Sequence, residues 1–394
     1  MELAEFRAQT RAWLEDNCPA GARGPGPVHT GSRLIPIPHP DLDVWLERMA
    51  AKGWTTPTWP TEYGGAGLST AEYLVLLEEM RAAGARAPLS NRGPTMVGPT
   101  ILEYGTEEQK RRLLPMIARG EGAWCQGYSE PGAGSDLASL RTSGVLDGDQ
   151  YVINGHKIWT SDGDWCEWMF LIVRTNPEAS KHEGISFFVM KMDQPGITVK
   201  PIQMISGASP FCETFFDDAV ADKRDMIGKP NEGWTVGKRL LQHERSGMEM
   251  LAAGATSGRR AAGIVEIAKA YAPTTAGGHI EDPATRDAVI NQEMQTLALR
   301  LTQRRIAQEA SDGRTPGPAT SIMKIVSTEI EKDHAELTVQ LMGTQGQGWE
   351  GAAFTEQEIG ATRRFLSSRA ASIYSGSNEI QANIIAKRVL GLPD

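Results

Sequence analysis

The period at which apolar residues recur changes twice along this chain of 394 residues. From about residue 1 to 120 the period is helical, and Ser69–Glu72 and Thr106–Gln109 both have the spacing of capping boxes at helix starts. From about 121 to 233, short runs rich in β-branched and aromatic residues alternate with turn dipeptides, and from 234 to 394 the period is helical again. The pattern predicts an α+β protein with an N-terminal helical domain (1–120), a middle antiparallel β-barrel or sandwich (121–233) and a C-terminal four-helix bundle (234–394).

Turn and stop signals add detail to this outline. Gly53 and Gly84 are placed as helix stops, and Asp147-Gly148 and Asn154-Gly155 are expected as turns between strands. The helices expected in the bundle lie near 234–272, 283–312, 317–342 and 376–391. The runs that predict strands are Tyr151–Ile153, Ile158–Trp159, Met169–Val173, Ile185–Met190, Thr198–Ile202 and Thr214–Phe216.

One charged residue, Glu244, interrupts the apolar face of a predicted helix. Glu244 follows Leu240 by four residues and precedes Met248 by four, so its carboxyl group is expected to share their face. Loss of hydration there raises the pKa of a carboxyl group, which suits a general base that removes a proton. The alternative is a surface carboxylate at the edge of the face, paired with Arg245. The apolar positions of this helix are Val236, Leu240, Leu241, Met248, Leu251 and Ala252.

Charge and composition exclude several classes of protein. The net charge of −9 and the lack of a long basic run argue against a nucleic-acid partner. Apolar runs such as Met169–Val173 are far shorter than the roughly 18 residues of a membrane span, and the acidic start Met1–Glu5 is unlike a signal peptide. The four cysteines are scattered without a Cys-x-x-Cys pair, which predicts reduced thiols, a cytoplasmic protein and no metal site.

Two segments of the β-rich zone carry residues suited to binding a ligand. The Gly-rich stretch Gln126–Asp136 joins a predicted strand to a loop whose backbone can approach a planar or anionic ligand, although a plain tight turn is the alternative. It is neither a Walker loop nor a dinucleotide fingerprint. Trp159-Thr160-Ser161 ends a strand with a large flat side chain beside two hydroxyls, which suits a flavin, whereas core packing alone also explains Trp159.

These residues resemble a known family. Gly127–Asp136 followed by Asn154–Ser161 is similar to the paired flavin-binding segments of the acyl-CoA dehydrogenase family, with matching spacing. Further matches are Gly228–Trp234 and Ile373–Ile380, so the resemblance spans almost the whole chain. The family has an N-terminal helical domain, a middle β-barrel and a C-terminal four-helix bundle, in agreement with the three zones.

The resemblance implies that the protein is a flavoprotein enzyme of lipid β-oxidation that binds FAD and an acyl-CoA. Gln126, Tyr128 and Ser129 are expected along the isoalloxazine, with Trp159, Thr160 and Ser161 on its other side. The further residues implied for FAD are Gln340, Gly343, Ser375, Ser377 and Glu379. The residues implied for the substrate are Ser135, Arg245 and Tyr374.

The usual catalytic carboxylate of the family is missing at its C-terminal position, because Ser375 stands there. A minority of relatives carry the base on the first helix of the bundle in a Glu-Arg dipeptide, which Glu244-Arg245 resembles. Glu379 is the other candidate, but it stands in the first turn of a helix, where an acid is favoured by the dipole. The implied reaction is removal of the α-proton by Glu244 with hydride transfer to flavin N5, giving a trans-2-enoyl-CoA, and the electrons then pass to an electron-transfer flavoprotein.

One family segment is absent. The Arg-x-x-Phe-Gly stretch that contacts the FAD pyrophosphate of a neighbouring subunit is replaced by 277–286, where Arg286 is a possible substitute, whereas Gln340–Gly346 is partly kept. The resemblance therefore implies either a homotetramer or an α2β2 heterotetramer with a related subunit, as in relatives that act on steroid side-chain or dicarboxylic acyl-CoAs. Gly247 near the base leaves room for a bulky acyl group. The alternatives are a flavin monooxygenase or oxidase of the same fold, and a non-catalytic subunit of a complex.

Overall fold

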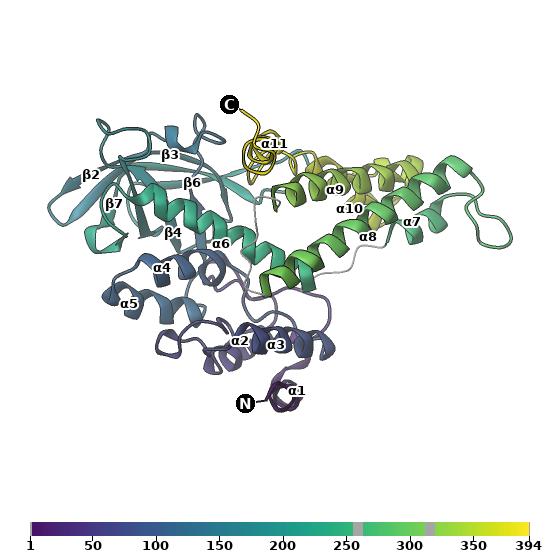
Figure 1. Ribbon diagram of the computed structural model, residues 1–394, viewed down its shortest axis with the longest axis horizontal. Helices are drawn as coiled ribbons and strands as arrows, with labels where there is room; N and C mark the ends of the chain where they lie inside the picture. The colour runs from purple at the N-terminus through teal and green to yellow at the C-terminus, as the bar shows by residue number, and fades with distance from the viewer. Residues whose placement is uncertain (1, 255–262, 312–319, 394) are drawn as a thin grey trace. The chain divides into compact units, whose positions relative to one another are not determined.

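The computed structural model of the protein describes residues 2–254, 263–311 and 320–393 (Figure 1). The chain divides into two compact units, and each is described by itself. The first unit comprises Met1–Ile202 and Ser209–Arg259, and the second comprises Gln203–Ala208 and Arg260–Asp394. No described helix is both long and apolar enough to cross a membrane.

The first unit begins with helices, as the apolar period predicts. Both predicted capping boxes are confirmed. The side chains of Ser69 and Thr106 each accept from the third backbone N–H of a helix, and the side chains of Glu72 and Gln109 accept from the backbone N–H of Ser69 and Thr106. Gly53 and Gly84 follow helix ends at φ of +69° and +65°, a backbone conformation that glycine adopts without strain. The helices are α1 (Leu3–Asn17), α2 (Pro40–Ala51), α3 (Thr70–Ala82), α4 (Gly98–Tyr104) and α5 (Glu107–Ala118), with a π-helical turn η3 (Gly93–Val97) before α4.

A sheet of eight described strands follows the helices. Its order is β6-β7-β3-β2-β4-β5-β8, and β1 pairs with β4 in parallel. The helical, β, helical order is confirmed, but the sheet is an open path and not the closed antiparallel barrel expected. Pro201 lies in β6, at one end of the path, where its missing N–H is tolerated because no further strand of the described residues pairs there. The strands are β1 (Trp124–Gly127), β2 (Ser143–Asp147), β3 (Gln150–Ser161), β4 (Trp168–Arg174), β5 (Ile185–Lys191), β6 (Ile197–Ile202), β7 (Phe211–Asp222) and β8 (Met226–Ile227).

One predicted turn is wrong and the other is confirmed. Asp147-Gly148 turns the chain between β2 and β3, with Gly148 at φ +61°. Asn154-Gly155 instead lies inside the twelve-residue strand β3, where the pairing with β7 shifts register between Ile153 and Gly155. The glycine therefore serves a β-bulge, which bends the strand without ending it.

Helix α6 (Gly233–Gly254) belongs to the first unit and contacts β4, β5, α4 and η3 (Figure 1). Two residues of its predicted apolar face, Val236 and Leu240, are buried in the core at 2% and 0% exposure. They pack in one cluster with Phe170 and Phe187 of the sheet. The start of α6 is thus held by burial against the sheet.

The second unit is helical, and α9 contacts each of its other described helices (Figure 1). Helix α10 was not predicted, although Thr355 and Glu358 form a capping box at its start. The stretch expected as one helix at 376–391 is a short α-helix followed by a π-helical turn, η7 (Ile385–Val389). The helices are α7 (Ile264–Tyr271), α8 (Pro283–Ser311), α9 (Thr320–Met342), α10 (Glu356–Ser368) and α11 (Asn378–Ile384).

Candidate active site

The Gly-rich segment follows β1 as predicted, and its residues differ in what they present to a ligand. Gln126 and Ser129 are partly exposed. The ring of Tyr128 is buried and lies edge-on to Phe170 and Phe187. Its hydroxyl donates a hydrogen bond of 3.4 Å to Gly237 O of α6. The side chain of Tyr128 is therefore part of the core, so only its backbone can serve a cofactor.

The two predicted flavin segments lie side by side. The backbone N–H of Ile158 in β3 donates to Ser129 O at 2.9 Å. Next to this bond, Lys157 Nζ donates to Tyr128 O at 3.1 Å. Residues some thirty positions apart in the chain thus meet at β3, a strand that is paired with β2 and β7.

Trp159 is the most unusual residue of the site. It lies in β3 at φ +62°, a left-handed conformation that is costly for a bulky residue. The pairing of β3 with β7 shifts register between Lys157 and Thr160, and the indole is 50% exposed, in edge contact with Phe211. A strained aromatic side chain turned out of a strand is typical of a ligand-binding position.

The two hydroxyls beside Trp159 point to different environments. Thr160 is fully buried, backbone included, and its hydroxyl accepts from that of Thr214 at 3.3 Å, so this residue packs in the interior of the first unit. Ser161 is partly exposed. A half-exposed indole, with Ser161 on the same strand and Ser129 on the neighbouring segment, fits a flat ring system with polar edges such as a flavin.

The rest of the Gly-rich loop is open. A Cβ added to Gly132 or to Gly134 would have no atom of another part of the protein within 4 Å. Ser135 is exposed. The neighbouring Asp136 pairs with Lys181, and hydrogen bonds from that lysine and from Ser139 lower the pKa of the carboxyl group. The loop is therefore accessible to an extended ligand with polar groups.

The predicted base lies in α6, the helix whose start is packed against the sheet. Position 244 is in the helical part of the chain, one turn after the buried Leu240, but the side chains of Glu244 and Arg245 lie outside the described residues. The last described side chain before them is His243, which is partly buried. Burial lowers the pKa of His243 from its ordinary value.

In the second unit, the predicted residues gather at the start of α11. Ser375 and Gly376 both have positive φ, +54° and +85°, and Tyr374 is half exposed. Ser377 caps α11 by accepting from Ile380 N at 3.4 Å. Glu379 lies in the first turn, and hydrogen bonds from its own backbone and from Ser377 lower its pKa, which agrees with a structural acid at a helix start.

The remaining predicted residues of the second unit lie near the end of α9 and the start of α8. Gln340 donates to Glu336 at 3.4 Å within α9, and Gly343 opens the 3-10 turn η6 (Gly343–Gln347) at φ +56°. Arg286, the possible substitute for the missing arginine, donates to Ile280 O at 3.2 Å. Among the described residues, no group of three His, Cys, Asp or Glu can hold a metal ion, and the four cysteines are free and buried.

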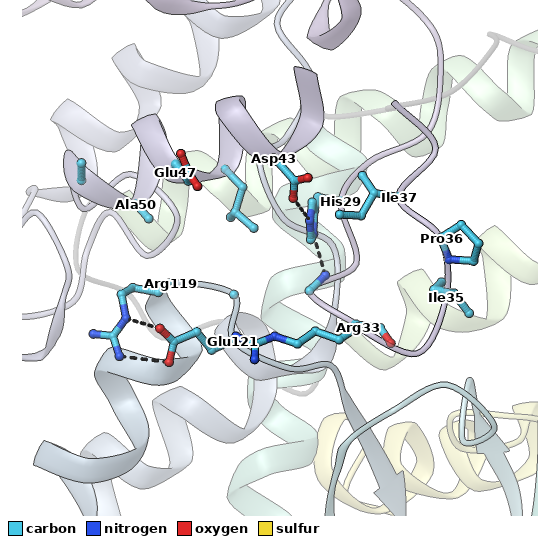
Figure 2. Close-up of a pocket in the computed structure, with 15 residues that line it drawn as sticks. His29, Arg33, Ile35, Pro36, Ile37, Asp43, Glu47, Ala50, Arg119 and Glu121 are labelled. Atoms are coloured by element: carbon cyan, nitrogen blue, oxygen red, sulfur yellow. Dashed lines mark hydrogen bonds and ion pairs between the residues drawn. The ribbon is translucent and has the colours of Figure 1, made fainter. Parts of the chain in front are cut away.

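A cavity of about 780 Å³ lies elsewhere in the first unit, between α2 and the segment that follows His29. Figure 2 shows two polar contacts at it, a hydrogen bond of 3.0 Å between His29 and Asp43 and an ion pair of 2.7 Å between Arg119 and Glu121. None of the predicted site residues is among the residues that line it.

Two polar pairs near the candidate site were missed by sequence reasoning. One is Lys157 with Glu130, for which the only signal was a lysine at the alternate positions of β3 that include Tyr151 and Ile153. The other is Arg239 of α6 with Glu103 of α4, which no local pattern reveals because the partners are 136 residues apart. In addition, Asp225, the residue before β8, is buried and paired with Arg112.

Three family models match the chain in order along its length. They are the acyl-CoA dehydrogenase N-terminal domain over residues 2–121, the middle domain over 125–219 and the C-terminal domain over 231–390. The middle match contains both predicted flavin segments, and the C-terminal match contains α6.

Individual relatives match over most or all of the chain. Acyl-CoA dehydrogenase IpdE1 of Mycobacterium tuberculosis is 38% identical over 398 residues, covering 100% of this chain and 98% of that protein. Acyl-CoA dehydrogenase FadE26 of the same species is 33% identical, covering 88% of this chain and 87% of that protein. The solved structure of the Tcur3481-Tcur3483 steroid ACAD has a TM-score of 0.75 at 30% identity, covering 99% of this chain and 97% of that one.

A second solved structure, the ChsE4-ChsE5 complex from Mycobacterium tuberculosis, has a TM-score of 0.74 at 28% identity and covers 100% of this chain and 98% of that one. The family models and the relatives agree, and the two predicted flavin segments lie side by side in the structure. The chain therefore belongs to the acyl-CoA dehydrogenase family, whose members are FAD-dependent flavoprotein oxidoreductases that act on acyl-CoA.

Proposed function

We propose that the protein catalyses α,β-dehydrogenation of an acyl-CoA thioester with Glu244 as general base. The observation that carries the proposal is the position of Glu244 in α6, one turn after Leu240, which is fully buried against the sheet that bears the flavin segments. The usual position of the base holds Ser375, which has no carboxyl group. A carboxylate on the face of α6 that Leu240 occupies would lose hydration, and such a loss raises the pKa of a carboxyl group toward that of a useful base.

In this proposal, Glu244 removes the α-proton of the thioester. FAD, when bound, supplies the hydride acceptor for the β-carbon. Ser129 and Ser161 present hydroxyls to the flavin edge, Trp159 presents its face, and Tyr128 contributes backbone, while Thr160 is buried beside Trp159. Ser135 and Arg245 orient the CoA and the thioester. The residues proposed to complete the FAD site are Gln126, Gln340, Gly343, Ser375, Ser377 and Glu379, with Tyr374 beside the acyl group.

For the substrate, we propose a bulky acyl-CoA such as a steroid-derived thioester, with an electron-transfer flavoprotein as electron acceptor. The name of a similar solved structure, a steroid ACAD, supports the substrate class. Gly247, three residues beyond Glu244, adds no side chain near the base and so leaves space for a large group. The four free cysteines support a cytoplasmic location.

The proposed assembly is an α2β2 heterotetramer with a related subunit, with a homotetramer as the alternative. Two similar structures have titles that name two different chains, Tcur3481-Tcur3483 and ChsE4-ChsE5. The stretch 277–286 lacks the family's Arg-x-x-Phe-Gly segment, which supports the idea that another chain contributes the missing arginine. Helix α8 also carries an exposed apolar row that a partner helix would cover: Ile290, Met294, Leu297 and Leu301.

The test is anaerobic bleaching of the bound flavin by straight-chain, branched and steroid acyl-CoAs, in the wild-type protein and in Glu244→Gln. Rapid bleaching by a thioester, reduced by roughly a thousandfold or more in Glu244→Gln with FAD still bound, is the expected result. Glu379→Gln changes the other candidate carboxylate and is compared at equal FAD content, because Glu379 is also proposed to belong to the FAD site. Bleaching that survives Glu244→Gln but is lost in Glu379→Gln would assign the role of base to Glu379. Absence of bleaching with rapid oxygen consumption would favour an oxidase or monooxygenase.

A further inference from the structure

Lys157 is a charged residue in the interior of the first unit. Its side chain is fully buried, and its Nζ lies 2.8 Å from Glu130 Oε1 and 3.1 Å from Tyr128 O. Burial, opposed by the Glu130 carboxylate, lowers the pKa of Lys157 to about 8. Because a buried ion pair contributes little net stability compared with apolar residues of the same size, its presence here calls for another explanation.

Glu130 connects three segments of the chain through one carboxylate. Oε2 accepts from Arg141 N at 2.6 Å, and Oε1 accepts from Thr142 N at 2.9 Å as well as from Lys157. The backbone of Glu130 also exchanges two hydrogen bonds of 3.0 Å with Ala133 across the Gly-rich loop. A carboxylate that accepts from this many directions fixes both the position and the orientation of the loop that carries it.

Lys157 connects this carboxylate to the strained part of β3. In a regular strand, residues 157 and 160 would point to opposite faces, but both Lys157 and Thr160 are fully buried. The register shift between Lys157 and Thr160 allows both side chains to point inward, and it leaves the side chain of Trp159 half exposed, with its backbone at φ +62°. Trp159 is therefore flanked by two inward-pointing side chains, Lys157 bound to Glu130 and Thr160 bound to Thr214.

We propose that the buried Lys157–Glu130 pair is a positioning element for the cofactor, which sets the spacing between Ser129 and Trp159 on the two segments that hold FAD. Lys157 and Glu130 do not touch the cofactor in this proposal. They act through the residues next to them, Ser129 before Glu130 and Trp159 two positions after Lys157. The inference rests on the proposed location of the FAD site.

The directional bonds explain why charge is used here. An apolar pair would fill the same volume but would leave the loop after β1 free to shift relative to β3, because apolar contacts have no preferred direction. The bonds of Lys157 to Glu130 and to Tyr128 O hold the loop at one place along the strand. Since Trp159 is in a conformation that its own backbone disfavours, such fixed neighbours are needed to keep it there.

The experiment replaces the pair by neutral side chains of similar size in Lys157→Met/Glu130→Gln. The matched control is Arg119→Met/Glu121→Gln, which removes an exposed ion pair of similar length, 2.7 Å, that lines the cavity beside α2 and not the predicted flavin segments. Three quantities are measured on each protein, purified with its partner subunit if the two co-purify. They are the FAD dissociation constant on reconstitution, the visible circular dichroism of the bound flavin and the melting temperature of the apoprotein.

We expect the buried-pair variant to bind FAD roughly ten- to a hundredfold more weakly and to change the flavin circular dichroism, with the apoprotein melting within about 5 °C of wild type. The control should match wild type in all three quantities. Wild-type FAD affinity and dichroism in the folded buried-pair variant would overturn the inference, and so would a lower melting temperature with unchanged FAD affinity, which indicates a structural role alone.

A second variant keeps the test decisive if the double variant does not fold. Glu130→Asp retains the charge but withdraws the carboxylate by one methylene group, so the inference predicts weaker FAD binding although the ion pair remains possible. Unchanged FAD affinity in Glu130→Asp would count against the inference. If wild type binds FAD, acyl-CoA bleaches that flavin and the variants behave like wild type, this inference alone is rejected. If wild type binds no FAD, the proposed FAD site itself is rejected.

Discussion

Arg239 of α6 donates three hydrogen bonds to Glu103 of α4, from Nε to the two carboxylate oxygens at 2.9 and 2.8 Å and from Nη2 to Oε1 at 2.6 Å. These bonds hold the pKa of Glu103 below its ordinary value. His243 Nε2 lies 3.6 Å from the same carboxylate. The pair joins α6 to α4 a little more than one turn before Glu244, so it fixes the rotation of α6 about its axis at the point where the proposed base follows.

The first prediction concerns this pair. Glu103→Gln and Arg239→Met should each lower the turnover number by roughly ten- to a hundredfold, because a displacement of about 1 Å at a reacting group is that costly. FAD content should stay at the wild-type level, since neither residue belongs to the flavin segments. Steady-state kinetics with the acyl-CoA that bleaches the flavin fastest provide the measurement. Lys238→Met, an exposed position on the same helix, is the control, and equal losses in the control and in the pair would contradict the prediction.

The second prediction separates stability from binding at Trp159. Trp159→Gly should leave the apoprotein as stable as wild type or more stable, since glycine removes a left-handed strain of about 1 kcal/mol. The same change should weaken FAD binding about tenfold or more, because the half-exposed indole face is lost. Thermal unfolding of the apoprotein and FAD titration are the two measurements.

The control for this substitution is Asp218→Gly, at another left-handed position of the sheet, φ +54°. It should change stability without changing FAD affinity. If Trp159→Gly destabilised the apoprotein by several kcal/mol while FAD bound normally, Trp159 would be a packing residue and the flavin platform would have to be sought elsewhere.

The third prediction concerns the exposed apolar row of α8. Ile290, Met294, Leu297 and Leu301 are 44–62% exposed and follow one another at intervals of four, three and four residues, the spacing of a helix-packing seam. Leu297→Lys should weaken the assembly at least about tenfold, because a charge replaces an apolar contact. Light scattering after size-exclusion chromatography reports the mass of the complex.

Asn291→Lys introduces the same charge at an exposed position of α8 outside the row and should leave the assembly intact. An unchanged mass and dissociation constant in Leu297→Lys would show that the partner does not cover this row.

The fourth prediction concerns pH and the attachment of α1. Glu79 is 3% exposed and accepts from Arg11 Nε and Arg7 Nη1, both at 2.8 Å. Hydrogen bonds, that of Arg11 foremost, hold the pKa of Glu79 below its ordinary value of 4.5. Since the folded state binds the proton less tightly than the unfolded chain, the pair stabilises the fold above pH 4.5, and this contribution is lost as the pH falls through the lower, folded-state pKa.

Glu79→Gln should therefore lower the melting temperature at pH 7 and reduce the further drop seen on acidification. Glu78→Gln, which removes a more exposed partner of Arg7, should change both quantities less. Calorimetry between pH 7 and pH 3 tests this, and parallel curves for wild type and Glu79→Gln would contradict the role assigned to the carboxylate.

Several features of the fold were predictable because local chemistry determines them. Ser69 and Glu72 at a helix start can satisfy each other's backbone groups in almost any context, so the capping box formed as expected. Thr355 and Glu358 carry the same signal for α10 and were overlooked. In contrast, the local sequence Asn154-Gly155 is ambiguous, because glycine suits both a turn and a β-bulge. The pairing of β3 with β7 determines that a bulge forms there.

The sequence by itself determined the order of helical and β zones and the family, and it predicts the two flavin segments, because these depend on apolar period and on residues close together in the chain. Only the tertiary structure decided which side chains of those segments face outward. Trp159 is exposed while Thr160 and Tyr128 are buried, and the charges that hold this arrangement, Lys157 and Glu130, come from different segments. A strand alternates its faces by default, so an exception such as Trp159 arises where contacts distant in sequence outweigh the local preference.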